Sequence, residues 1–129
     1  MTTVSPVLLD HLRAAARSYR VSLSDDGRWV LVANFALPAG YNAATTQVLL
    51  GIPPDYPLRP PGVLPYGIFV EPGLRYRGSH HCNIVEGRGP GWGRWAWLCL
   101  YRVDWNPRRD DLVRCLEMCR TVLSNPQAR

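Results

Sequence analysis

The first segment of the chain carries apolar residues at the spacing of a helix. Between residues 6 and 19, charged positions separate apolar ones that recur every three or four residues: Leu8, Leu9, Leu12, Ala15 and Ala16. Ser5 followed by Pro6 is a favourable helix start, because serine can cap free N–H groups and proline fits the first turn. The pattern predicts an amphipathic first helix.

β-branched and aromatic residues then predict a series of strands separated by turns. Asp26-Gly27 is typical of a hairpin turn, and Gly40-Tyr41-Asn42 marks a second turn. The expected strands are three longer ones and a short fourth: residues 20–25, 28–37, 45–52 and 66–70. Because the connections are short, we expect an antiparallel meander.

The composition changes after the third strand. Seven of the 12 prolines lie between Pro53 and Pro72, and eight of the 11 glycines lie between Gly62 and Gly93. Proline removes a donor from a sheet and glycine frees the backbone, so we expect this region to be mostly ordered loop. A long loop inside a compact domain is typically functional.

Regular structure is expected to resume at Trp95 and to end in a second helix. Asn106 is the predicted N-cap and Pro107 the first helical residue, with the acidic pair 110–111 in the first turn, where the helix dipole favours acids. Apolar residues then follow helical spacing: Leu112, Cys115, Leu116, Cys119, Val122 and Leu123. The helix should stop near residue 125, before a proline.

The order of elements predicts an α+β fold in which helices pack against one antiparallel sheet. With 129 residues, 47% of them apolar, we expect a single domain over residues 1–129. No stretch approaches the ~20 apolar residues of a membrane-spanning helix. The first residues lack the basic start and apolar run of a signal peptide, so we expect a cytoplasmic protein whose four cysteines are free thiols.

All 15 basic residues are arginine, and the net charge is +5. Codon bias is one interpretation of the missing lysine. The other is that an enzyme handling activated esters benefits from a chain without side-chain amines, because the guanidinium stays protonated. The positive charge suits an acidic partner surface, either protein or nucleic acid.

Four short motifs follow one another along the chain: Tyr56-Pro57-Leu58-Arg59-Pro60-Pro61, His81-Cys82-Asn83-Ile84, Cys99-Leu100 and Trp105-Asn106-Pro107. In this order they resemble the Tyr-Pro-x-x-Pro-Pro, His-Pro-Asn-Ile, catalytic Cys-Leu and Trp-Ser-Pro motifs of the ubiquitin-conjugating enzymes, with a cysteine in place of one proline. The resemblance covers residues 5–125. It implies that family's fold: an N-terminal helix, an antiparallel four-stranded meander, a long active-site loop and a C-terminal helix.

A bacterial branch of this superfamily is closer still. Leu37-Pro38-Ala39-Gly40-Tyr41-Asn42, together with the Tyr-Pro loop and the Trp-rich stretch before Trp105, is similar to that branch. Its members occur in operons with an activating enzyme, a ubiquitin-like protein and a deconjugating peptidase. The resemblance therefore implies these partners and a role in antiphage defence.

The chain departs from the family in three places. Asn83 precedes Cys99 by 16 residues, about twice the usual spacing, and residues 87–93 look like the insertion. Tyr101 and Arg102 stand where the bacterial branch tends to carry a histidine. The sequence also ends after one helix, where the eukaryotic family adds two more.

Cys99 is the residue that the resemblance identifies as the nucleophile. A thioester carrier needs an accessible thiolate, and Arg94 and Arg102 are nearby cations that would favour one. From the residues alone, an interior strand with a buried cysteine is the favoured interpretation of the segment around Cys99, and the family resemblance is what favours the nucleophile.

Cys82 is the rival nucleophile, since a thiol beside the imidazole of His81 is an activated arrangement. Cys115 and Cys119 are four residues apart on the apolar face of the last helix, and we expect both in the core.

Asn83 has two interpretations. The resemblance implies stabilisation of the oxyanion when an amine attacks the thioester, whereas an Asx-turn is the local alternative. We expect His81 to hold the loop. Asp104 either orients an incoming lysine or simply precedes the helix as a favourable acid.

Three residues are candidates for contact with partners. Trp92 lies between glycines, and exposed aromatics concentrate at interfaces, so it is a candidate contact with the carried protein. In the family the first helix meets the activating enzyme, which makes Arg13 and Arg17 candidates there; a solvated face is the alternative. We expect Trp95 or Trp97, and also Trp105, to anchor the core.

The resemblance implies a conjugating transferase that needs no metal or organic cofactor of its own. A non-catalytic binding module of the same fold is the first alternative. A nucleic-acid-binding domain is the second, because arginines are interleaved with aromatics, although they are scattered along the chain. Zinc binding is the third, with His80, His81, Cys82 and Cys99 as ligand types that lack a paired spacing.

Overall fold

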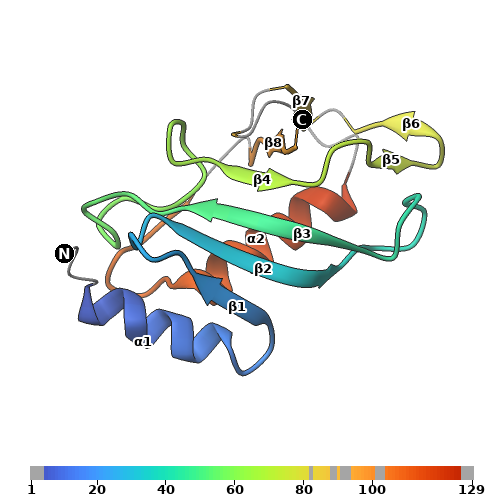
Figure 1. The fold of residues 1–129 in the computed structure, drawn as a ribbon. Helices are drawn as coiled ribbons and strands as arrows, with labels where there is room; N and C mark the ends of the chain where they lie inside the picture. Colours follow the sequence, from blue (N-terminus) through green and yellow to red (C-terminus); the bar gives the residue numbers. More distant parts are fainter. Residues whose placement is uncertain (1–4, 82, 88–89, 91–93, 101–103, 126–129) are drawn as a thin grey trace.

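The computed structural model describes residues 5–81, 83–87, 90, 94–100 and 104–125. Its centre is an antiparallel six-stranded sheet in the order β1-β2-β3-β4-β8-β7 (Figure 1). The strands are β1 (Arg20–Leu23), β2 (Trp29–Ala36), β3 (Thr45–Gly51), β4 (Ile68–Val70), β7 (Ile84–Glu86) and β8 (Ala96–Leu98). The predicted four-stranded meander is confirmed as β1 to β4, and β8 and β7 extend it.

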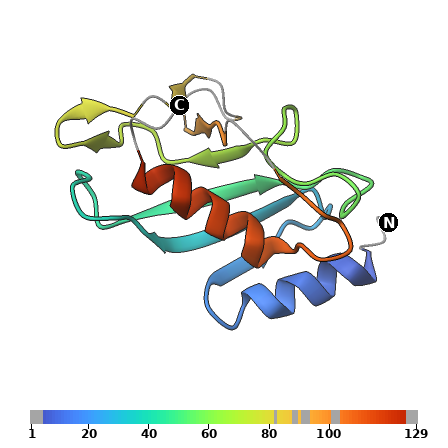
Figure 2. The same ribbon diagram turned by 180° about the vertical axis from the view of Figure 1, so that it is seen from behind.

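Two helices complete the α+β fold. Helix α2 (Leu112–Ser124) lies across one face of the sheet, and α1 (Pro6–Ala15) runs beside β1 and packs against α2 (Figures 1 and 2). The predicted class, with an N-terminal helix, an antiparallel sheet and a C-terminal helix, is confirmed.

The sheet has an inner face covered by α2 and an outer face turned away from it. Alternate residues of the central strands point inward and are fully buried in the core: Val30, Val32, Val48, Leu50, Ile68 and Val70. Their neighbours Leu31 and Leu49 face outward and are half-buried. The alternation of apolar residues in the sequence therefore fixes which face each strand presents to the core.

Helix α1 is shorter than predicted and buries a narrower stripe. Leu8 and Ala15 are buried, but Leu9 is 38% exposed and Ala16 is exposed. The helix ends at Ala15 because residues 16–18 form a turn that leads into β1. Ser5 is the N-cap residue, but its side chain makes no capping hydrogen bond.

The predicted start of the last helix is wrong by five residues. Asn106 closes a turn instead: its Oδ1 accepts from the Arg108 N–H at 3.0 Å, and Asp110 Oδ2 accepts from the Asn106 N–H at 2.7 Å. Helix α2 begins at Leu112, with Asp111 as the N-cap, whose Oδ1 accepts from the Arg114 N–H at 3.0 Å. Two acidic residues that suited a first turn therefore stand before it.

The region expected to be mostly loop contains short strands. Besides β4 and β7, a small second sheet pairs β5 (Arg75–Tyr76) with β6 (Ser79–His80). Its hairpin is joined to the turn between β2 and β3, where the Asn42 N–H donates to the Arg75 carbonyl at 3.0 Å and the Arg77 N–H to the Gly40 carbonyl at 2.7 Å. The segment before His81 is thereby tied to the sheet.

Candidate active site

Cys99 directly follows β8, at the edge of the sheet formed by β8 and β7. Its backbone N–H donates to the Asn83 carbonyl at 2.7 Å, which continues the β7–β8 pairing of Ile84 with Leu98. Leu98 and Leu100 are buried in the core, whereas Cys99 between them is partly exposed. The alternation therefore turns the thiol away from the core, towards the outer face.

Asn83 is fastened to Cys99 a second time through its side chain. Its Nδ2 donates to the Cys99 carbonyl at 2.9 Å, and the residue is only 6% exposed. Their separation of 16 positions in sequence is accommodated because β7 and β8 pair as a hairpin and the insertion lies between them. The unusual spacing thus leaves the expected neighbours side by side.

His81 is fully buried and holds this segment against α2. Its Nδ1 accepts from the Asn83 N–H at 2.9 Å, so the proton of the neutral ring is on Nε2, which donates to the Val122 carbonyl at 3.1 Å. Burial lowers the pKa of His81 below its ordinary value, and the bond to Val122 opposes this shift. A neutral imidazole with both nitrogens engaged is suited to holding the loop, as expected.

Tyr41 packs on His81 and reaches the same helix end. The two rings are stacked, with centroids 6.4 Å apart, and the Tyr41 hydroxyl donates to the Leu123 carbonyl at 2.6 Å. Sequence reasoning noted Tyr41 only as part of a motif and did not assign it this contact. The one indication in the sequence that Tyr41 matters was its place in the segment that is similar to the bacterial branch.

The Tyr-Pro loop connects α1 with the segment that follows Cys99. Tyr56 is buried, burial raises the pKa of its hydroxyl, and the hydroxyl oxygen shares a hydrogen bond with His11 Nδ1 at 2.6 Å. Trp105 packs against the Tyr56 ring, and its Nε1 donates to the Pro57 carbonyl at 2.8 Å. The scaffold role expected for this loop agrees with these contacts.

The other thiols of the described residues are unsuited to the role of carrier. Cys115 and Cys119 are completely buried in the core, as predicted. A hydrogen bond with Cys115, together with burial, raises the pKa of Cys119. Cys82 lies outside the described residues.

Four further candidate residues lie near Cys99 in the sequence, and the structure describes two of them. Arg94 and Asp104 are exposed. Arg102 and Trp92 lie outside the described residues. Within the part of the chain that the structure describes, no group of three His, Cys, Asp or Glu side chains could hold a metal ion.

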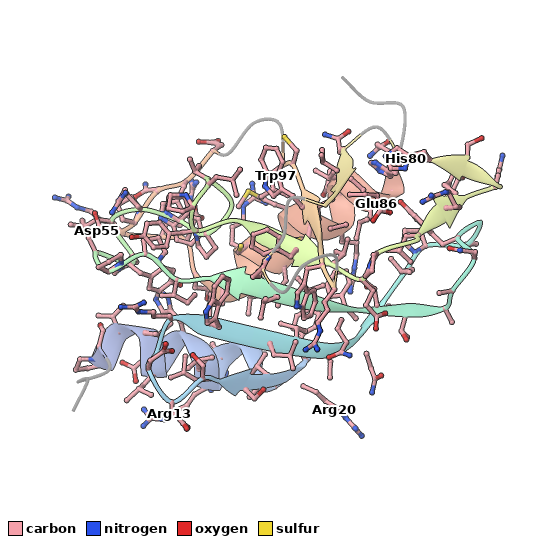
Figure 3. The ribbon with its side chains drawn as sticks, turned by 45° about the horizontal axis from the view of Figure 1, so that its top comes forward. Arg13, Arg20, Asp55, His80, Glu86 and Trp97 are labelled. Atoms are coloured by element: carbon pink, nitrogen blue, oxygen red, sulfur yellow. The ribbon has the colours of Figure 1, made fainter. Side chains whose placement is uncertain are left out.

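Arg13 of α1 and Arg17 of the turn that follows α1 are exposed and lie far from the thiol. Arg13 donates to Asp10 at 2.9 Å, and Arg17 is exposed one turn later. Trp97 lies in β8, the strand that leads to Cys99. In Figure 3, Arg13 and Trp97 lie on opposite sides of the molecule. The structure therefore does not bring Arg13 and Arg17 together with the other candidates.

Sequence reasoning placed Trp95 or Trp97 in the core, but both are only partly buried and neither belongs to the core. Trp97 is the nearer of the two to Cys99 in sequence. It pairs with Phe69 of β4 and Val85 of β7, and it points outward because Ala96 and Leu98 on either side are buried. The sequence does carry a signal for this orientation. Between residues 96 and 100 every second residue is apolar and small or aliphatic, and this period of two predicts that the residues between them, Trp97 included, point outward.

A shallow groove of about 480 Å³ also lies on the outer face. Leu31 and Leu49 of the sheet line it together with Pro90, Arg94 and Trp95 of the segment between β7 and β8, but Cys99 does not. Pro90, Arg94 and Trp95 thus lie near β2 and β3 on this face.

Comparison with known proteins gives one family. The model of the family described as Prokaryotic E2 family E matches residues 9–125. No match was found among curated proteins or among solved structures. None of the helices in the described residues has the length and hydropathy needed to cross a membrane.

Proposed function

The chain belongs to prokaryotic E2 family E, and we propose that it carries a ubiquitin-like protein as a thioester on Cys99 and transfers it to a target. The observation that carries this proposal is the partial exposure of Cys99 at the end of β8, in contrast to the buried Cys115 and Cys119. The family supports a conjugating transferase in general terms. The order of the four motifs supports Cys99 as its nucleophile.

The proposed reaction has two acyl transfers. In the first, the Cys99 thiolate attacks the thioester on the activating enzyme, a new C–S bond forms at Cys99, and the activating enzyme's thiolate leaves. In the second, an amine or hydroxyl of the target attacks the Cys99 thioester. The new C–N or C–O bond replaces the C–S bond, and the proton of the attacking group passes to solvent as the Cys99 thiolate leaves.

We assign Asn83 and His81 to positioning. The amide of Asn83 binds the carbonyl of Cys99, and His81 holds the backbone of Asn83, so the two residues fix the peptide that carries the thiol. Stabilisation of the oxyanion by Asn83 is a separate role that variants distinguish, as described in the Discussion.

The partners follow from the family. We propose that the activating enzyme contacts the exposed arginines Arg13 of α1 and Arg17 of the turn that follows it, and that Trp92 contacts the carried protein. The likeness to the operon-borne bacterial branch is the basis for proposing a cytoplasmic role in antiphage defence.

One experiment tests the carrier. The chain is incubated with its activating enzyme, its ubiquitin-like protein and ATP, and adducts are resolved with and without reducing agent. Wild type should give an adduct that thiols cleave, Cys99→Ser an adduct that resists thiols because an oxygen ester replaces the thioester, and Cys99→Ala none.

Cys82→Ala is the matched control and should form the adduct at the rate of wild type. If Cys99→Ala retains the adduct and Cys82→Ala loses it, Cys82 is the carrier. If wild type forms none, while still binding the ubiquitin-like protein, the chain is a non-catalytic module.

A further inference from the structure

The indole N–H of Trp97 is a buried donor with no acceptor. Among the described residues, Trp97 Nε1 is the one buried side-chain nitrogen or oxygen that lacks a hydrogen-bond partner. Burying a donor without a partner is unfavourable, and native structures contain few such groups. An unpaired donor is therefore available to bind an acceptor that arrives from outside the chain.

This donor belongs to the face of the sheet that carries the candidate nucleophile. Residues 96, 98 and 100 point into the core, so Trp97 and Cys99 both point towards the outer face, two residues apart on one extended segment. Side chains two residues apart on a strand are neighbours on the same face.

The indole ring is turned so that its N–H edge lies on the Cys99 side of Phe69. A Cβ added at Gly67 would lie 3.3 Å from Trp97 Cδ1, the atom bonded to Nε1. Phe69 pairs with Trp97, and continuing this antiparallel register by two residues sets Gly67 opposite Cys99. Because Gly67 has no side chain, the space above it is occupied by this edge of the indole together with Phe69 Cζ, 3.0 Å from the added Cβ, and Leu64.

Leu64 closes this space from the solvent side. Its Cδ2 would lie 3.0 Å from the same added Cβ at Gly67, and the residue is 39% exposed. Exposed side chains change rotamer within nanoseconds. Rotation of Leu64 would therefore open the space that the Nε1 side of the indole borders, without any change in the backbone.

We propose that Trp97 Nε1 donates a hydrogen bond to the acyl oxygen of the thioester on Cys99, an inference that rests on the proposed function. When an amine attacks, the acyl carbon becomes tetrahedral and its oxygen becomes negative. The indole N–H stabilises that oxygen and keeps its own proton while the Cys99 thiolate leaves. Donors aimed at a developing oxyanion stabilise the transition state more than the ground state.

The test compares discharge of the loaded enzyme in single turnover. The chain is loaded by its activating enzyme, the activation is quenched, and loss of the thioester is followed at increasing concentrations of hydroxylamine. Replacing Trp97 with 3-benzothienylalanine keeps the shape of the ring and removes only the N–H. The maximal rate should fall by about a hundred- to a thousandfold, with little change in the concentration that gives half-maximal rate.

Stability separates this role from a structural one. Because the N–H is unpaired in the free chain, the benzothienyl variant should unfold at the same urea concentration as wild type. Leu64→Ala opens the space beside the donor and should discharge at least as fast as wild type. Trp29→Phe, a change of another tryptophan on the outer face, should leave discharge unchanged.

Discharge of the benzothienyl variant within twofold of wild type overturns the proposal. The proposal is also overturned if the benzothienyl variant is less stable than wild type and this loss of stability accounts for its slower discharge. If wild type never forms the thioester, both the proposed function and this inference are wrong. If wild type forms the thioester and the benzothienyl variant discharges it at the wild-type rate, only this inference is wrong.

Discussion

Asn83 and Cys99 hold each other by two hydrogen bonds, one from the Cys99 N–H to the Asn83 carbonyl at 2.7 Å and one from the Asn83 side chain to the Cys99 carbonyl at 2.9 Å. The residues are 16 positions apart in sequence, and β7 and β8 pair directly beside them. The backbone that carries the thiol is therefore fixed on both sides.

Removing the Asn83 donor should destabilise the fold. Asn83→Asp keeps the shape and turns an acceptor towards the Cys99 carbonyl, so the free energy of unfolding in urea should fall by about 1–3 kcal/mol. Asn125→Ala is the control, because Asn125 also donates to a backbone carbonyl at 2.9 Å but is exposed, and it should cost less than about 0.5 kcal/mol. A stable Asn83→Asp variant with slow discharge would instead assign Asn83 to the oxyanion alone.

Stability should fall in mild acid because of His81. Its pKa in the folded chain lies below that of the unfolded chain, so between the two values the unfolded state binds more protons. The contribution is complete above about pH 6.5, the ordinary histidine value, and is lost as the pH falls towards the folded value. Urea unfolding of wild type and His81→Gln from pH 7.5 to 5 should show a shallower pH dependence in the variant.

His80→Gln is the matched control for that measurement, because His80 is exposed. Its pH dependence should stay much closer to wild type than that of His81→Gln, with a small flattening because His80 also lowers the pKa of His81. An equal flattening in both variants would mean that the buried ring is not the source of the acid sensitivity.

The link between α1 and the Tyr-Pro loop should contribute to stability. Tyr56→Phe removes the hydroxyl that is hydrogen-bonded to His11, and we expect a loss of about 1 kcal/mol in the free energy of unfolding. Tyr66→Phe, a half-buried tyrosine of the same loop, is the comparison and should change little. Thermal unfolding of the two variants is measured at the same pH. Equal melting temperatures for Tyr56→Phe and Tyr66→Phe would refute the stabilising link between His11 and Tyr56.

Both Asp111 and Ser5 are N-cap residues, but the side chain of Asp111 should contribute more to the free energy of unfolding than that of Ser5. Asp111→Ala removes the bond to the Arg114 N–H and should cost about 0.5–2 kcal/mol. Ser5→Ala removes no capping bond, and its effect should be negligible. Equal losses in denaturant melts would show that the serine caps in solution.

The longer elements were predictable because their periodicity spans several residues. In β2 and β3 the alternation of apolar residues decides the inward face, and the same period continues to Cys99 and places its thiol outward. The pairing of Asn83 with Cys99 follows from the order of the motifs, despite the insertion.

Other features were not predictable because local signals competed. Asn106 and Pro107 read as a helix start, yet Asp110 binds the Asn106 N–H and closes a turn, which moves the start to Leu112. Strands β5, β6 and β7 have two or three residues, too few to show any period. The unpaired N–H of Trp97 is a property of packing that no sequence pattern records.

The hairpin of β7 and β8 has a consequence for how this family can diversify. Its base is closed by the bonds between Asn83 and Cys99, so residues can be added or removed between Glu86 and Ala96 without displacing the sulfur. Loop closure becomes only slightly less favourable as a loop lengthens. Recognition of new partners can therefore evolve in this segment while the chemistry stays constant.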